Sequence, residues 1–171
     1  MMSVYTDGSW TAGRSTIGVA VFHAGYVQLS GVHVVAKNNN EAELLAAMNG
    51  IYQAFHSYRE VHLHTDSTYV INRIQKALDR VHQMSDIHLN ELEQLVTYIV
   101  LRGGRLQVSH VRAHRTDYNN LLVDVAARVA DSGDFQLTLN YSELRDWVRA
   151  HQTEFLRSTR SASIRRAVSQ W

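Results

Sequence analysis

The chain has 171 residues, of which 45% are hydrophobic, and a formal net charge of +1 at pH 7, which fits one globular domain with at most a small appendage. The absence of cysteine excludes disulfides, thiol nucleophiles and cysteine-based zinc sites. The N-terminus lacks the apolar segment of a signal peptide, and no apolar run approaches the length that spans a bilayer. We therefore expect a cytoplasmic protein with no membrane association.

Charge is distributed unevenly along the chain. Residues 135–171 contain six arginines and three acidic residues, so this segment is net positive and the preceding residues are net negative. Such an asymmetry favours two parts with different roles. We expect a compact domain over residues 1–134 and a C-terminal extension over residues 135–171.

The first third of the chain predicts an antiparallel meander. Apolar and β-branched residues predict strands over 2–10, 16–23 and 26–35, with Gly13 in the first connection and Ala24-Gly25 in the second. The polar residues 37–40 end the meander and supply N-caps for a helix. The chain therefore begins as three strands joined by short turns.

Helices and strands alternate after the meander. Apolar residues at helical spacing predict helices over 40–57, 67–78, 86–102 and 120–130, and short β-branched runs predict strands over 61–65 and 106–111. Helical crossovers of this kind join parallel strands and are right-handed in nearly all proteins. The element order therefore predicts an α/β fold, with a five-stranded mixed sheet of three antiparallel and then two parallel strands, flanked by helices.

The C-terminal extension begins with a further helix signal. Asn140 and Glu143 have the spacing of a capping box. An amphipathic helix over 141–156 is predicted by side chains that recur at helical spacing: Leu144, Trp147, Val148, His151 and Phe155. Residues 157–171, which hold four arginines and no acid, are expected to be loosely ordered. This arginine-rich tail is a candidate for contact with a nucleic acid or a protein partner.

Four acidic residues stand at the ends or starts of predicted elements. Asp7 lies toward the end of the first strand, Glu43 lies in the first helix, Asp66 follows the fourth strand and Asp124 lies in the last helix of the domain. Taken singly, the first three also fit a turn, a capping box and a helix cap. Asp124 is harder to explain in this way, because the helix around it is rich in alanine and valine.

The joint pattern of these residues resembles ribonuclease H of type 1. The matching motifs are Thr6-Asp7-Gly8-Ser9, Asn39-Asn40-Glu41-Ala42-Glu43-Leu44, Thr65-Asp66-Ser67, and His114 followed by Asn120 and Asp124. The resemblance covers roughly residues 2–132 and implies the same mixed sheet. It implies that Asp7, Glu43, Asp66 and Asp124 are catalytic carboxylates, and that His114 is the family's mobile loop histidine.

Four converging carboxylates raise one another's pKa, and divalent cations relieve the repulsion. Oxygen ligands favour Mg²⁺, with Mn²⁺ as a substitute, and two such ions can stabilise the attacking and the leaving oxygen. We expect Asp7 to bridge the two ions. The expected reaction is endonucleolytic hydrolysis of the RNA strand of an RNA/DNA hybrid, which leaves 5′-phosphate and 3′-hydroxyl ends, with His114 in proton transfer or product release.

Substrate choice is expected to depend on the minor groove, where an RNA strand presents its 2′-hydroxyls. Candidate contacts lie beside the acids: Gly8, Ser9, Asn39, Asn40, Thr68 and Asn120. The chain departs from many bacterial members of the family in two respects. It lacks the basic, tryptophan-rich protrusion before the fifth strand, and its loop after Asp7 is short. We therefore expect a short-form, monomeric enzyme whose body alone binds the hybrid weakly.

Three alternatives compete with this interpretation. The spacing of His62, His64 and Asp66 matches zinc β-lactamase-like hydrolases, but Ser67 stands where that motif continues with histidine. A nuclease of the same fold could act on DNA, although the Asn-x-x-Glu helix and the His114 loop argue against it. A module that binds hybrids without cleaving them is the third alternative, and the presence of all four acids argues against that.

Overall fold

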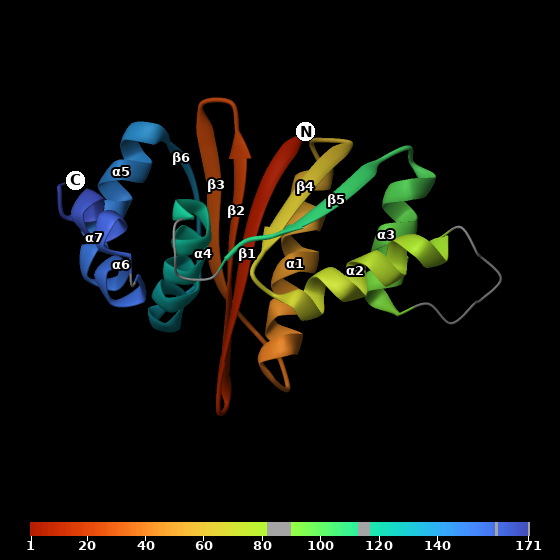
Figure 1. Cartoon of the computed structure of the whole chain (residues 1–171), viewed down its shortest axis with the longest axis horizontal. Coiled ribbons are helices and arrows are strands. Elements are labelled where there is room, and N and C mark those ends of the chain that lie inside the picture. Colours follow the sequence, from red (N-terminus) through yellow and green to blue (C-terminus); the bar gives the residue numbers. More distant parts are fainter. Residues whose placement is uncertain (82–89, 113–116, 160, 171) are drawn as a thin grey trace.

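The computed structural model (Figure 1) describes residues 1–81, 90–112, 117–159 and 161–170. Its strands are β1 (Met2–Thr11), β2 (Arg14–His23), β3 (Tyr26–Val34), β4 (Glu60–Thr65), β5 (Arg105–His110) and β6 (Phe135–Asn140). Its helices are α1 (Asn39–Phe55), α2 (Thr68–Val81), α3 (Glu91–Leu101), α4 (Tyr118–Val129), α5 (Tyr141–Ala150), α6 (Gln152–Ser158) and α7 (Ala162–Ser169), with a 3₁₀ turn at Ala130–Ser132.

The strands form one mixed sheet in the order β5-β4-β1-β2-β3-β6. Strands β1, β2 and β3 pair antiparallel, whereas β4 lies parallel to β1 and β5 parallel to β4. This arrangement confirms the predicted fold class. The predicted strand number is wrong by one, because β6 pairs antiparallel with β3 and places Leu137 opposite Leu29.

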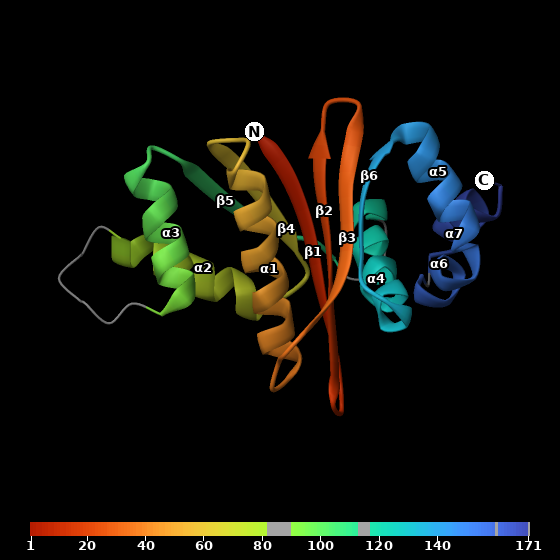
Figure 2. The same ribbon diagram turned by 180° about the vertical axis from the view of Figure 1, so that it is seen from behind.

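Helices cover the two faces of the sheet, and each face has its own hydrophobic core (Figures 1 and 2). Successive residues of a strand point to opposite faces, so Val4 of β1 joins the core formed with α1, α2 and α3. Its neighbour Tyr5 joins the core formed with α4 and the C-terminal helices. The central strand therefore has a packed helix on each side.

Glycine allows both helices to approach the central strands closely. A Cβ atom on Gly8 would lie 2.4 Å from the carbonyl carbon of Ala42 in α1, and one on Gly18 would lie 2.0 Å from the carbonyl oxygen of Val123 in α4. Neither distance leaves room for a methyl group. The two glycines therefore set how near α1 and α4 lie to the part of β1 that carries Asp7.

The C-terminal extension is more ordered than the sequence predicted. The capping box of Asn140 and Glu143 is confirmed, but the predicted single helix is two helices, because α5 ends at His151. The expectation of a loose tail is wrong for α7, which buries Ile164 and Val168 in the α4-side core. The extension is joined to the sheet through β6 and packs on α4 through α6.

None of the helices in the described parts of the chain combines the length and the apolar character needed to cross a membrane.

Candidate active site

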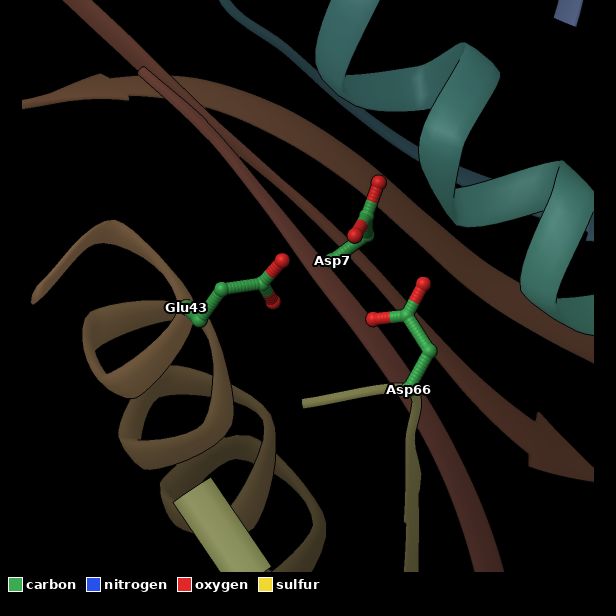
Figure 3. A group of neighbouring side chains, drawn as sticks. All are labelled: Asp7, Glu43 and Asp66. Atoms are coloured by element: carbon green, nitrogen blue, oxygen red, sulfur yellow. The ribbon is translucent and has the colours of Figure 1, made fainter. Parts of the chain in front are cut away.

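Three carboxylates gather beside strand β1 (Figure 3). Asp7 comes from β1, Glu43 from the first turns of α1, and Asp66 from the residue that follows β4. One carboxylate oxygen of each lies within 4.8 Å of the others. Asp7 and Glu43 are only 8% and 7% exposed. The structure therefore brings together three of the four acids that the sequence singled out.

Strand pairing and a backbone hydrogen bond explain this convergence. β1 and β4 run parallel, with Tyr5 opposite His64, so Asp7 and Asp66 lie at equivalent positions, two residues beyond the last pair of this ladder. The carboxyl ends of parallel strands are a common location for sites in α/β sheets. The Gly8 N–H donates a 3.1 Å hydrogen bond to Oε2 of Glu43, which orients this carboxylate toward the strand.

Asp124 approaches the same region from α4, but it is outside the tight group of three. Its Oδ1 lies 3.6 Å from Nε of Arg128, one helical turn later. Its Oδ2 is buried and has no hydrogen-bond partner among the described residues. A buried, unpartnered carboxylate oxygen is costly, so this atom is available for a cation or a ligand.

Burial and mutual repulsion make the carboxylates difficult to ionise. Burial first, and then the charges of Glu43, Asp124 and Asp66, raise the pKa of Asp7 well above its usual range. Burial, followed by the charge of Asp66, raises the pKa of Glu43 to about 8, although the Gly8 N–H opposes this shift. A divalent cation removes the repulsion, and a donor set made only of carboxylate oxygens suits a hard ion such as Mg²⁺.

The carboxylates lie in a polar cleft of about 470 Å³. All six residues predicted to contact substrate line it: Gly8, Ser9, Asn39, Asn40, Thr68 and Asn120. The sequence analysis did not identify four further lining residues: Trp10, Ser67, Tyr69 and Arg128. Each lies one to four residues from a predicted site residue, so proximity along the chain was the available signal. Arg128 is the only lysine or arginine among the described lining residues.

The predicted loop histidine, His114, lies outside the described residues. The end of its loop is described, because Asp117 caps α4 and accepts hydrogen bonds from the backbone N–H groups of Asn119 (2.9 Å) and Asn120 (3.1 Å). This cap begins the helix that carries Asn120 and Asp124. The side-chain Oδ1 of Asn120 is buried and has no hydrogen-bond partner among the described residues.

The histidines of the alternative zinc motif have structural contacts. Nε2 of His62 lies 2.6 Å from Oγ of Ser109, and the ring of His64 stacks on Tyr5 with centroids 4.3 Å apart. Burial lowers the pKa of His64. Within the described parts of the chain, Asp7, Glu43 and Asp66 are the only group of acids or histidines placed to share a metal. This arrangement argues against the zinc-hydrolase alternative.

Solved structures with the same architecture are ribonucleases H. RNase H1 from the halophilic archaeon Halobacterium salinarum NRC-1 is 20% identical, with 77% of this chain and 97% of that chain covered and a TM-score of 0.51. LC9-RNase H1, described as a type 1 RNase H with the type 2 active-site motif, is 19% identical, with 94% and 85% covered and a TM-score of 0.59.

A third similar structure is the N-terminal RNase H domain of rv2228c from Mycobacterium tuberculosis, solved as a fusion with maltose binding protein. It is 19% identical, with 77% of this chain and 96% of that chain covered and a TM-score of 0.56. At these identities the likeness shows the fold, which is that of ribonuclease H. No curated protein matches the chain.

The family model for RNase H matches residues 1–132. The chain belongs to the RNase H family.

Proposed function

We propose that the protein hydrolyses the RNA strand of RNA/DNA hybrids endonucleolytically and leaves 5′-phosphate and 3′-hydroxyl ends. One observation carries this proposal: three carboxylates, of which Asp7 and Glu43 are buried, lie within 4.8 Å of one another in a polar cleft, in a chain of the RNase H family. Such a group is unfavourable without cations and becomes functional with them.

We assign two Mg²⁺ ions, for which Mn²⁺ can substitute, to the carboxylates of Asp7, Glu43, Asp66 and Asp124. When bound, such ions lower the pKa of the attacking water and neutralise charge on the leaving 3′ oxygen. The raised pKa values of Asp7 and Glu43 and the unpartnered Oδ2 of Asp124 support this assignment.

The protein's own groups hold these ligands in position. The Gly8 N–H orients Glu43, and Arg128 lies beside Asp124. We retain Asp7 as the ligand that would be shared by the two ions, and its location on a central strand, packed between α1 and α4, supports this assignment. We retain His114 as the residue that transfers a proton or assists product release.

The residues around the acids would contact the ribose groups of the strand that is cleaved. Asn39 and Asn40, at the start of α1, line the cleft beside Gly8 and Ser9. Asn120 presents a buried amide oxygen without a partner, which can accept a hydrogen bond from a ribose 2′-hydroxyl. Thr68, at the start of α2, also lines the cleft. Requiring several 2′-hydroxyls would distinguish RNA from DNA at the cut strand.

The decisive test is cleavage of a hybrid with a labelled RNA strand in the presence of Mg²⁺, beside RNA/RNA and DNA/DNA duplexes of the same sequence. We expect internal cleavage of the hybrid RNA alone, with 5′-phosphate products, and no cleavage in EDTA. Equal cleavage of the DNA duplex would instead support a nuclease that acts on DNA. Binding without cleavage would support the non-catalytic module.

A further inference from the structure

Helix α2 carries a row of basic side chains outside the carboxylate cleft. Arg73, Lys76 and Arg80 follow Tyr69 at helical spacing, so all four side chains lie on one face of the helix. A neighbouring face, about 100° further around the helix, is apolar and buried: Val70, Ile74 and Ala77. Because the apolar face is in the core, the basic row (Arg73, Lys76 and Arg80) is directed away from it, and Lys76 and Arg80 are exposed.

The basic row begins at the cleft. Tyr69 lines the cleft with the carboxylates. The guanidinium carbon of Arg73 lies 5.9 Å from the centroid of the Tyr69 ring, which links the first cation to the cleft wall. From Tyr69 to Arg80 the helix rises about 16 Å, at about 1.5 Å per residue. The row therefore leads away from the cleft along one helix.

The basic row lines a small pocket. Arg73, Lys76 and Arg80 line a concavity of about 210 Å³ together with Asn90, Leu92 and Glu93. Nη1 of Arg80 donates a 2.8 Å hydrogen bond to Oε1 of Glu93, which is only 7% exposed. This acid neutralises Arg80 alone. Within the described parts of the chain, Arg73 and Lys76 have no acidic partner within ion-pair distance.

We propose that the basic row binds the phosphate backbone of the nucleic acid that enters the carboxylate cleft. This inference rests on the proposed function, because it takes a duplex as the ligand. The cleft itself has four carboxylates and one arginine, so it offers a polyanion little attraction beyond its metal ions. Duplex affinity comes largely from cations that displace phosphate counterions.

The dimensions of the row fit this ligand. Phosphates of one duplex strand follow one another at about 3.4 Å along the axis, so the roughly 10 Å of helix from Arg73 to Arg80 spans about three of them. Guanidinium groups bind phosphate oxygens through paired hydrogen bonds, and lysine acts as a point charge. The basic row would therefore supply charge that the missing basic protrusion would otherwise supply.

The test compares two sets of variants of equal charge. The first replaces the basic row by Arg73→Gln, Lys76→Gln and Arg80→Gln. The second replaces three cations near the other end of α1, Arg59→Gln, Arg102→Gln and Arg105→Gln, as the matched control. Affinity for an RNA/DNA hybrid is measured by fluorescence anisotropy across a salt series, with Asp7→Asn in every protein so that the hybrid stays intact.

We expect the row variant to lower the slope of log affinity against log salt by about 2 to 3, at roughly 0.9 per lost phosphate contact. Between about 50 and 200 mM salt, the protein with the intact row should then lose roughly 15- to 60-fold more affinity than the variant. The control set should keep the wild-type slope. With Asp7 intact, the row variant should have a raised KM and an unchanged kcat.

Two outcomes separate the possible failures. A row variant that binds like the control set would overturn the inference, even if the enzyme cleaves hybrids normally. Absence of cleavage by the wild type would remove the proposed function, and the salt slopes would still decide the inference. Arg80→Gln leaves the carboxylate of Glu93 buried without its partner, which can destabilise the fold. A double variant, Arg73→Gln with Lys76→Gln, retains the Arg80–Glu93 ion pair and should lower the salt slope by about 2.

Discussion

Two helices reach Asp7 from opposite faces of the sheet, and they hold their carboxylates in different ways. On the α1 side, Glu43 accepts a hydrogen bond from the Gly8 backbone. On the α4 side, Asp124 has a side-chain neighbour, Arg128 at 3.6 Å, and one buried oxygen without a partner. Because a backbone N–H moves less than an exposed arginine side chain, the carboxylate of Glu43 is preorganised. The buried oxygen of Asp124 instead needs a bound ligand to provide its interaction partner.

The largest expected effect removes the acid that both sides share. Asp7→Asn should abolish hydrolysis, and without metal its melting temperature should be unchanged or higher, because a buried charge in a repulsive group is removed. Mg²⁺ should stabilise the wild type more than the variant. Calorimetry with and without Mg²⁺ measures this. A variant that unfolds would assign Asp7 a purely structural role in its turn.

The glycines beneath the two helices should give the next largest effect. A methyl group on Gly8 or Gly18 collides with the backbone of α1 or α4, so Gly8→Ala and Gly18→Ala should each cost about 3 kcal/mol of stability. Gly8→Ala also displaces the donor to Glu43. Denaturant unfolding measures the stability, and wild-type unfolding free energies in either variant would contradict the close packing.

Substitution of Arg128 tests how Asp124, the less constrained of the two carboxylates, is held in position. Arg128→Gln should lower Mg²⁺ affinity by roughly 10- to 100-fold, the usual effect of removing a group that orients a metal ligand. Arg128→Lys should recover part of it, because it restores the charge without the planar group. Titration of Mg²⁺ by calorimetry gives the affinity independently of turnover. An unchanged affinity would mean that Asp124 needs no support from Arg128.

A smaller effect concerns the pH dependence of stability without metal. The folded pKa of Glu43 is raised to about 8, so its contribution to stability is present below the unfolded pKa and is lost as pH rises through about 8. In EDTA the melting temperature should therefore fall between about pH 5 and 9. Glu43→Gln should flatten this decline. A wild-type profile that stays flat would mean that the carboxylates do not repel one another.

The smallest expected effect is that of the arginines in the C-terminal tail, residues 157–171, on nucleic-acid binding. We retain the proposal that its arginines contact nucleic acid, with a protein partner as the alternative. Because α7 buries Ile164 and Val168, truncation would remove part of the core. Substituting Arg157, Arg165 and Arg166 by glutamine keeps the packing. If they touch phosphates, the salt slope should fall by about 2 to 3. An unchanged slope would favour the protein partner.

The site was predictable because its acids are tied to element boundaries. Asp7 and Asp66 each follow the last pair of the parallel β1–β4 ladder by two residues, so the topology alone brings them together, and the resemblance supplied Glu43. The sequence could not show that Asp124 stays outside the tight group, because this depends on how α4 packs against Gly18. The basic row was visible as spacing, but its link to the cleft through Tyr69 requires the structure.

The missed elements had weaker signals. Phe135, Leu137 and Leu139 alternate as a half-buried strand should, yet the charge asymmetry drew the predicted boundary just before them. In α7, Ile164 and Val168 are one helical turn apart. The composition of residues 157–171 is nevertheless dominated by four arginines, which led to the expectation of a loose tail. Both elements are stabilised by partners distant in sequence, which local patterns do not reveal.

Strand β6 also affects the order in which the protein can be completed during synthesis. Gly31 of β3 pairs with Phe135 of β6, so β3 waits for a partner that leaves the ribosome more than 100 residues later. At about 5 to 20 residues per second, this delay lasts roughly 5 to 20 seconds. Throughout it β3 is an open sheet edge, a template for pairing with other nascent chains. A chain ending at residue 132, where the family match ends, would keep that edge open permanently.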